Sequence, residues 1–243
     1  VGLGRMLEPV DIANMLMQSP IEPLLANRHI VITAGPTREE IDPVRFISNH
    51  SSGKMGYALA KAALALGAKV TLVSGPVNLS PPAGIEVIDV VSAEQMHQAV
   101  MKVVANCDIF IGCAAVADYK PQQKTQQKIK KSNSELTLTF TKNPDILSDV
   151  AHLAQPPFTV GFAAETQGVA DYAQDKLKRK KLDMIAANDV SQAGLGFNSE
   201  KNALNVYWNN GEKNLGVADK SQLALTLMTL VAQRHTEKMS SIK

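Results

Sequence analysis

The stretch 49–56 combines residue types that bind an anion with the first turn of a strongly patterned helix. Asn49, His50 and Ser51 offer polar side chains, while Gly53 and Gly56 let a ligand or a second chain approach the backbone closely. The first N–H groups of a helix lack internal partners and favour a negative charge. We therefore interpret this stretch as an anion-binding loop.

A solvated loop is the alternative, in which these Asn, His and Ser side chains only cap the helix. The spacing does not match either common phosphate-binding signature. Lys54 is followed by Met55, unlike G-x-x-x-x-G-K-[ST], and no G-x-G-x-x-G follows the preceding strand. The loop therefore predicts anion binding without naming the anion.

The elements that must position this loop alternate along the chain. An apolar run before the loop is typical of a strand buried on both faces, and the connection at 36–52 is long enough to indicate a function. We expect strands at 30–35, 69–74, 85–90 and 108–115, and helices at 53–66 and 92–105, the second opened by a capping box of Ser92 and Gln95. This order predicts an α/β fold, a Rossmann-like doubly wound and mainly parallel sheet with helices on both faces and a small β extension.

The second half of the chain continues the pattern. Residues 136–141 alternate as a strand does, and Asn143 and Pro144 are predicted as the N-cap and first residue of a helix. Further strands are expected at 158–164, 183–187 and 203–208, with a hairpin turn at 210–211 and helices at 169–181 and 223–231. Residues 1–28, with a short helix at 9–17, are expected to be the tail and linker of a preceding domain, and 29–243 to form the main domain.

Charge and composition limit the possible partners. The 243 residues carry a net charge of only +2, so we expect neither nucleic acid nor membrane as partner. No membrane-spanning run or secretory signal is present, which favours a cytoplasmic protein. Two local tracts, 120–131 and 176–181, each hold five basic residues, and Lys176 and Lys180 fall on one helical face. A triphosphate would suit that face, although a solvated basic face is the alternative.

The two cysteines, Cys107 and Cys113, flank one apolar run. Their even spacing places them on the same face of the expected strand, roughly 20 Å apart, so they cannot form a disulfide. We interpret both as buried thiols of a reducing compartment.

Ligands of such sheets bind at the carboxyl ends of the strands. The fourth strand ends in small residues, against which a ligand can lie, followed by Asp118, which could hold a hydroxyl or a metal. A tight turn with a surface aspartate is the alternative at this position.

Eight stretches of the chain carry recognisable motifs, at 33–39, 42–45, 47–56, 112–118, 128–131, 142–146, 161–166 and 187–190. In this order, over about residues 29–235, they closely resemble the motifs of bacterial phosphopantothenoylcysteine synthetase. Members of this family usually form the C-terminal half of a bifunctional coenzyme A biosynthesis protein, behind a flavin-dependent decarboxylase. Residues 4–9 resemble the end of that half, and no flavin is expected in this chain.

The resemblance implies a two-step ligase. CTP activates the carboxylate of 4'-phosphopantothenate as an acyl-cytidylate with loss of pyrophosphate, and L-cysteine then displaces CMP to form the amide. Mg²⁺ and a homodimer are implied as well. The sequence leaves two alternatives, an NAD(P)-dependent oxidoreductase and a non-catalytic nucleotide-binding module, because the alternating pattern is shared by many functions.

The resemblance also implies site residues. For CTP they are Gly112, Cys113, Ala114, Asp118, Lys128, Asn143, Pro144, Asp145, Ile146, Phe162, Lys176 and Lys180. For phosphopantothenate they are Asn49, Ser51, Gly53, Ala114 and Ala115. Two of these are expected to be catalytic: the Asn49 amide binds the developing oxyanion, and Lys128 neutralises charge during activation. No residue is identified as a metal ligand.

Overall fold

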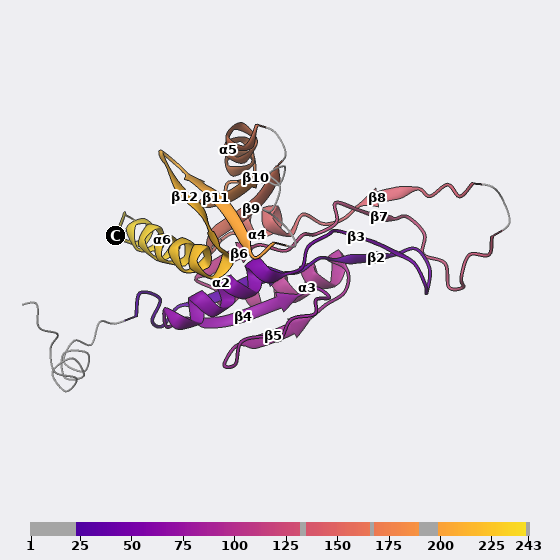
Figure 1. Cartoon of the computed structure of the whole chain (residues 1–243), viewed down its shortest axis with the longest axis horizontal. Helices are drawn as coiled ribbons and strands as arrows, with labels where there is room; N and C mark the ends of the chain where they lie inside the picture. The colour runs from indigo at the N-terminus through magenta and orange to yellow at the C-terminus, as the bar shows by residue number, and fades with distance from the viewer. Residues whose placement is uncertain (1–22, 132–134, 166–167, 190–198, 242–243) are drawn as a thin grey trace, which may run out of the picture.

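The computed structural model of the protein describes residues 23–131, 135–165, 168–189 and 199–241. Its centre is a sheet of eight strands in the order β12-β11-β10-β9-β6-β1-β4-β5 (Figure 1). These strands are β1 (His29–Ala34), β4 (Lys69–Ser74), β5 (Glu86–Asp89), β6 (Ile109–Gly112), β9 (Phe158–Glu165), β10 (Met184–Asp189), β11 (Lys201–Trp208) and β12 (Gly211–Asp219). The six neighbouring strands β5, β4, β1, β6, β9 and β10 pair in parallel. Strand β11 pairs antiparallel with both β10 and β12.

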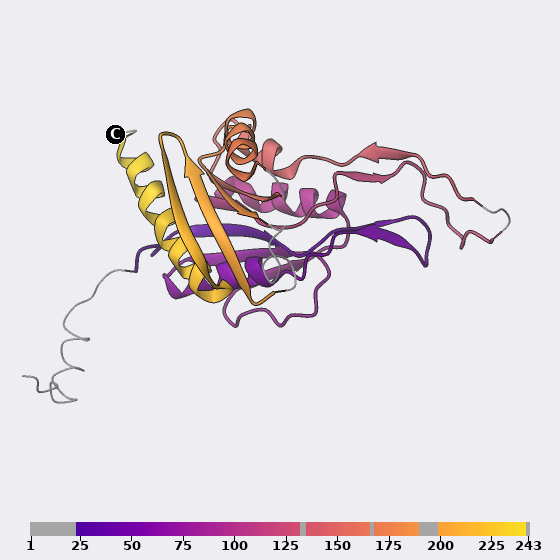
Figure 2. The same ribbon diagram turned by 45° about the horizontal axis from the view of Figure 1, so that its top comes forward.

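Helices cover both faces of the sheet and give three layers (Figure 2). The helices α2 (Lys54–Ala65) and α6 (Lys220–Ser241) pack against the face that carries Ile30, Ile32 and Val160. The opposite face is covered by α3 (Ala93–Val103), extended by the short 3₁₀ helix η1 (Val104–Asn106), by α4 (Ile146–Ala151) and by α5 (Val169–Arg179). The predicted doubly wound α/β fold is therefore confirmed, and no helix among the described residues is long and apolar enough to cross a membrane.

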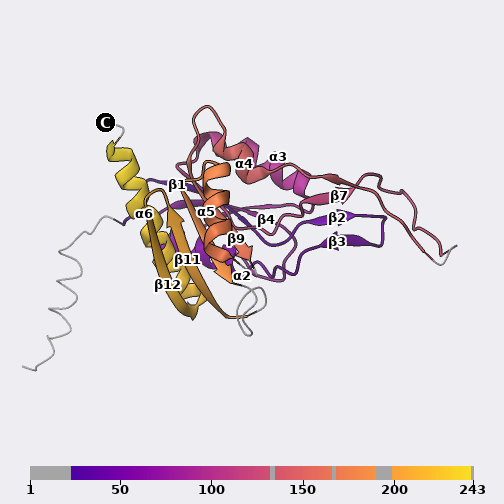
Figure 3. The same ribbon diagram turned by 90° about the horizontal axis from the view of Figure 1, so that it is seen from above.

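Two antiparallel ladders project beyond the carboxyl ends of the central strands (Figures 1 and 3). We call residues 38–48 the hairpin arm; it contains β2 (Arg38–Glu40) and β3 (Phe46–Ser48). The long arm is 119–142, in which β7 (Tyr119–Pro121) pairs with β8 (Phe140–Lys142). Apolar side chains on the arms are exposed, namely Val44, Phe46, Tyr119, Leu136 and Phe140.

Local sequence signals identified the core elements well. The strand at 69–74 has the expected bounds, the capping box of Ser92 and Gln95 is present, and Asn210 forms the turn between β11 and β12 with a positive φ of 63°. That hairpin extends the main sheet instead of standing apart from it. The helix expected at 9–17 lies outside the described residues.

Three expectations were wrong. The strand expected at 136–141 is reduced to β8, because only its end meets a pairing partner on the arm. The N-cap of α4 is Asp145 instead of Asn143, since the Asn143 amide is bound to the Ala117 carbonyl. Cys107 and Cys113 pack against opposite layers, because β6 is limited to Ile109–Gly112 and both cysteines lie outside it, so the alternation of a strand does not relate them.

Candidate functional site

A cavity of about 400 Å³ opens at the carboxyl ends of β1, β6 and β9, on the face covered by α4 and α5. It is lined by Thr33, Phe110, Gly112, Ala114, Val116, Ala117, Asp118, Tyr119, Lys142, Asn143, Pro144, Asp145, Ile146, Leu147, Phe162, Lys176 and Lys180. Parallel strands end together at this edge, so loops distant in sequence contribute to one wall. The position agrees with the strand-end rule applied to the sequence.

The cavity gathers all of the residues expected around CTP except Cys113 and Lys128. It also holds residues that the sequence reasoning did not assign. Thr33 accepts a hydrogen bond from the Ala114 N–H at 3.2 Å and so shapes the strand-end turn. Lys142 adds a third lysine to the lining. Its position directly before Asn143 was the sequence signal that could have indicated it as a site residue.

The two lysines of α5 are held in place by different partners. The Lys180 ammonium lies 2.7 Å from the Asp145 carboxylate, and the Lys176 ammonium donates to the Phe162 carbonyl at 2.9 Å. Burial by itself would raise the pKa of Asp145, but the hydrogen bonds from Lys180 and from the Ser148 N–H outweigh it and lower that pKa. Asp145 is therefore ionised at neutral pH and serves both as helix cap and as anchor for Lys180.

The Asn143 side chain presents an acceptor that has no hydrogen-bond partner among the described residues. Its backbone N–H donates to the Asp118 carbonyl, and its side-chain Nδ2 donates to the Ala117 carbonyl, each at 2.9 Å. The Nδ2 contact determines the orientation of the amide, and Oδ1 is left buried without a hydrogen bond within the described residues. A buried orphan acceptor in a cavity wall is costly, and a ligand donor would remove that cost.

The loop at 49–56 lies beside this cavity, at the ends of β1 and β6. The Asn49 side chain donates from Nδ2 to the Ala115 carbonyl at 2.9 Å, so it does not cap α2. The cap residue is Gly53, whose φ is 79° and which has no side-chain partner as a cap. The solvated-cap alternative is therefore wrong for Asn49, which ties the hairpin arm to the turn after β6.

The two glycines of the loop serve close packing within this chain. A Cβ on Gly53 would lie 2.7 Å from Val77 Cγ1, and one on Gly56 would lie 2.5 Å from the Ala34 Cβ. Gly56 thus lets α2 press on β1. The expectation that these glycines admit a ligand or a second chain was incomplete, because the nearest neighbour in both cases is the chain itself.

Two of the residues expected around CTP lie elsewhere. Cys113 packs toward α2 and α6, away from the cavity, and burial raises the pKa of its thiol to about 12. Lys128 is exposed on the long arm and does not line the cavity.

Within the described ranges, no group of three His, Cys, Asp or Glu side chains could hold a metal ion. The carboxylates in the cavity lining are Asp118 and Asp145. Mg²⁺ commonly keeps several waters and binds through substrate phosphates with one or two carboxylates. The donors present suit a Mg²⁺ ion delivered by a phosphate ligand better than one held in a protein cage.

Comparisons with known proteins agree with this α/β fold. A family described as the DNA/pantothenate metabolism flavoprotein C-terminal domain matches residues 25–235, and the chain belongs to this family. The coenzyme A biosynthesis bifunctional protein CoaBC of Vibrio cholerae serotype O1 is 56% identical over 237 residues, which are 96% of this chain and 59% of that protein. The chain thus spans somewhat more than half the length of this relative. The family resemblance found in the sequence is confirmed.

Solved structures show the same fold. The crystal structure of the C-terminal domain of a CoaBC protein has a TM-score of 0.76 and 38% identity, covering 88% of this chain and 99% of that one. A Cab2 mutant in complex with phosphopantothenate-cysteine has a TM-score of 0.75 at 15% identity, covering 96% and 91%. At that identity the likeness concerns the fold alone.

Proposed function

We propose that this chain is a ligase that joins 4'-phosphopantothenate to L-cysteine in coenzyme A biosynthesis, with CTP as the activating nucleotide. The carboxylate of phosphopantothenate attacks the α-phosphate of CTP, which forms an acyl-cytidylate and releases pyrophosphate. The cysteine amine then attacks the acyl carbon, and CMP leaves. The observation that carries the proposal is the single cavity in which nearly all residues expected around CTP come together.

The charge of the cavity supports a triphosphate. Lys142, Lys176 and Lys180 line it together with only two carboxylates, of which Asp145 is already paired with Lys180. A carboxylate is a poor acyl donor and repels a triphosphate, so its activation benefits from fixed positive charge near both anions. We assign Lys176 and Lys180 to the phosphates.

The orphan acceptor of Asn143 supports cytosine as the base. Cytosine carries an exocyclic amino group that donates hydrogen bonds, whereas uracil carries a carbonyl oxygen at the same place. A buried Oδ1 without a partner would be satisfied by the first and repelled by the second. We therefore propose that Asn143, with Pro144, Ile146 and Phe162 in the same wall, receives the cytosine ring.

The acyl centre belongs beside the turn after β6 in this proposal. Asn49 uses one N–H to hold the Ala115 carbonyl and keeps a second N–H that makes no hydrogen bond within the described residues. That N–H can bind the oxygen that becomes negative when cysteine attacks. Ser51, Gly53 and Ala114 would complete the phosphopantothenate site on the same side.

Further partners belong to the proposal. Mg²⁺ is expected to arrive with the nucleotide, held by its phosphates and by Asp118, and it would offset charge on the triphosphate. The exposed apolar side chains of the arms support a homodimer, because patches of this kind usually mark an interface. We also propose a cytoplasmic location and fusion to a preceding decarboxylase domain, as in the CoaBC relatives, without flavin in this chain.

The test is pyrophosphate release from CTP with and without 4'-phosphopantothenate. We expect pyrophosphate to be released only when CTP, 4'-phosphopantothenate and Mg²⁺ are all present. We also expect UTP to replace CTP poorly. Release that is independent of phosphopantothenate would contradict the ligase and favour a binding module with adventitious hydrolysis. Calorimetric titration with CTP and NAD distinguishes the ligase from the oxidoreductase alternative. An oxidoreductase would bind NAD tightly and would not bind CTP.

A further inference from the structure

The hairpin arm projects away from the central sheet (Figure 1). Its turn between β2 and β3 holds an ion pair of Asp42 and Arg45, in which the carboxylate is buried and the guanidinium is partly exposed. The Asp42 carboxylate is fully buried, and it accepts the backbone N–H groups of Val44 and Arg45, each at 2.8 Å. Its second oxygen receives the Arg45 Nε at 3.0 Å. A buried carboxylate on a projecting arm needs partners that compensate its lost hydration, and Arg45 supplies most of them.

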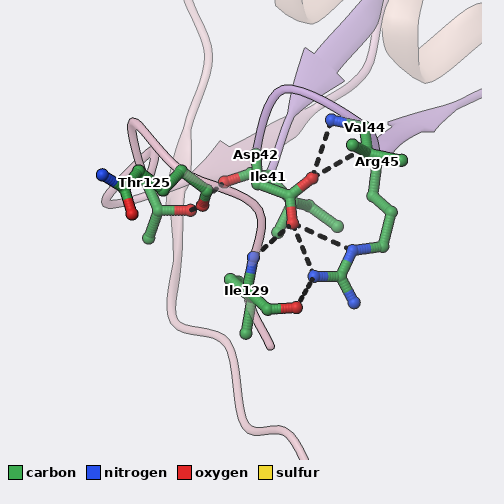
Figure 4. A network of polar contacts seen from close by, with 7 residues as sticks. Ile41, Asp42, Val44, Arg45, Thr125 and Ile129 are labelled. Atoms are coloured by element: carbon green, nitrogen blue, oxygen red, sulfur yellow. Dashed lines mark hydrogen bonds and ion pairs between the residues drawn. The ribbon is translucent and has the colours of Figure 1, made fainter. Parts of the chain in front are cut away.

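The same ion pair holds the main chain of the long arm. The Ile129 N–H donates to Asp42 Oδ2 at 3.1 Å, and Arg45 Nη2 donates to the Ile129 carbonyl at 3.0 Å (Figure 4). A second link joins the Thr125 N–H to the Ile41 carbonyl at 3.1 Å. Because both polar groups of Ile129 are bound by one ion pair, the position and the orientation of that residue's backbone are set together.

Apolar packing contributes little to the order of this part of the long arm. Along 122–131 every residue is exposed except Ile129, which is half-buried. A polar segment of this composition does not order by itself, because it cannot bury enough apolar surface to offset its conformational entropy. The contacts with Asp42 and Arg45 therefore provide the order that the sequence of the segment lacks.

One residue that we assign to catalysis adjoins this contact, and the other lies at the base of the hairpin arm. Lys128 immediately precedes Ile129, and Asn49 immediately follows the hairpin arm and is anchored on Ala115. We propose that Asp42 and Arg45 form a positioning pair, which grips Ile129 and so sets Lys128 in register with the loop that carries Asn49. This inference rests on the proposed function and deepens it.

The grip is present throughout the neutral range. The Arg45 guanidinium is the main cause that holds the pKa of Asp42 well below its usual range, with further lowering by the N–H groups of Val44, Ile129 and Arg45 against the opposing effect of burial. Asp42 therefore stays ionised at any pH at which the enzyme would work.

The test compares Asp42→Asn with a matched control, Glu40→Gln. The asparagine keeps the shape of the side chain, loses the charge that binds Arg45, and can place an N–H₂ group against the Ile129 N–H. Glu40 pairs with Lys124 between the same two arms, but both side chains are about half exposed, so this ion pair should contribute little. Arg45→Lys serves as a second variant, since it keeps the charge and loses the fork that reaches both Asp42 and Ile129.

Two measurements are made on each variant. The first is structural: hydrogen exchange at Ile129 and trypsin cleavage after Lys128 should be about tenfold faster in Asp42→Asn than in wild type, and unchanged in Glu40→Gln. The second is single-turnover formation of the acyl-cytidylate, which should be slower by about 10- to 100-fold in Asp42→Asn with CTP affinity unchanged, because Lys128 is misplaced and the cavity is intact.

The outcomes separate this inference from the proposed function. Exchange and cleavage that stay at wild-type rates in both Asp42→Asn and Arg45→Lys would overturn the grip. A loosened segment with an unchanged rate of cytidylate formation would overturn its positioning role. Wild-type protein that makes no cytidylate at all would overturn the proposed function and the positioning role with it, while exchange at Ile129 would still report whether the grip exists.

Discussion

Replacing Asn49 with aspartate tests whether the loop at 49–56 is catalytic or only structural. The Asn49 Nδ2 lies 2.9 Å from the Ala115 carbonyl oxygen and donates to it. Aspartate has almost the same shape but no N–H at either oxygen. The substitution therefore removes one hydrogen bond in the folded enzyme and, during cysteine attack, places a negative charge beside a developing negative charge.

The structure predicts different magnitudes for these two effects. Asn49 is exposed, so the lost bond should cost about 0.5–1.5 kcal/mol of unfolding free energy, since the carboxylate can turn toward water. Loss of an oxyanion donor commonly costs about 2.7–4 kcal/mol of activation free energy, or roughly 100- to 1000-fold in rate. Asn49→Asp should thus fold, bind CTP and form the acyl-cytidylate, yet fail to convert it to the amide.

Single-turnover assays measure the two half-reactions separately, with thermal unfolding measured in parallel. Ser48→Ala is the matched control, because the Ser48 hydroxyl also ties the hairpin arm to a carbonyl, that of Thr37 at 2.8 Å, and has no assigned role at the acyl centre. We expect the control to lose similar stability and to keep its rate of amide formation. Amide formation near the wild-type rate in Asn49→Asp, or an equal loss in Ser48→Ala, would refute the oxyanion assignment and leave Asn49 as an anchor.

Three further predictions concern the remaining elements. Lys128→Ala should leave the melting temperature unchanged and slow cytidylate formation by about 30- to 1000-fold, or about 2–4 kcal/mol; a rate within twofold of wild type would make the segment a solvated loop. Gly56→Ala should lower the free energy of unfolding in urea by about 1–3 kcal/mol, because its Cβ would lie 2.5 Å from the Ala34 Cβ, and a wild-type midpoint would contradict that contact. Cys107 and Cys113 are partly buried, and burial raises the pKa of both to about 12, so the reactive thiolate is scarce near neutral pH; iodoacetamide at pH 8 should label both much more slowly in the native protein than in urea, and equally rapid labelling would argue against the raised pKa.

The order of the core elements could be predicted from the sequence because it depends on local patterns. Continuous apolar runs identified β1 and β4, the cluster of helix formers ending at Gly67 identified α2, and the capping box identified the start of α3. Each of these signals lies within about a dozen neighbouring residues, so no knowledge of distant contacts is required. The family motifs then indicated which strand ends to examine, and most of the residues taken from them line one cavity.

Competition between distant partners decided the rest. Asn143 is a residue type that often caps a helix, but its side chain and its backbone N–H donate to the carbonyls of Ala117 and Asp118. Asp145 is therefore the N-cap of α4. Alternation at 136–141 predicts a strand, yet a strand extends only as far as another chain segment lies beside it.

Contacts between distant segments also determine where the proposed catalytic and positioning residues lie. Nothing local in the sequence indicates that Asp42 binds Ile129, which lies 87 positions away, or that Asn49 binds Ala115, 66 positions away. Hydrogen bonds between segments so far apart depend on the sheet, which holds the ends of β1 and β6 side by side. The sequence alone thus determines the layers and the types of residue available for chemistry, whereas the tertiary structure determines which of them meet.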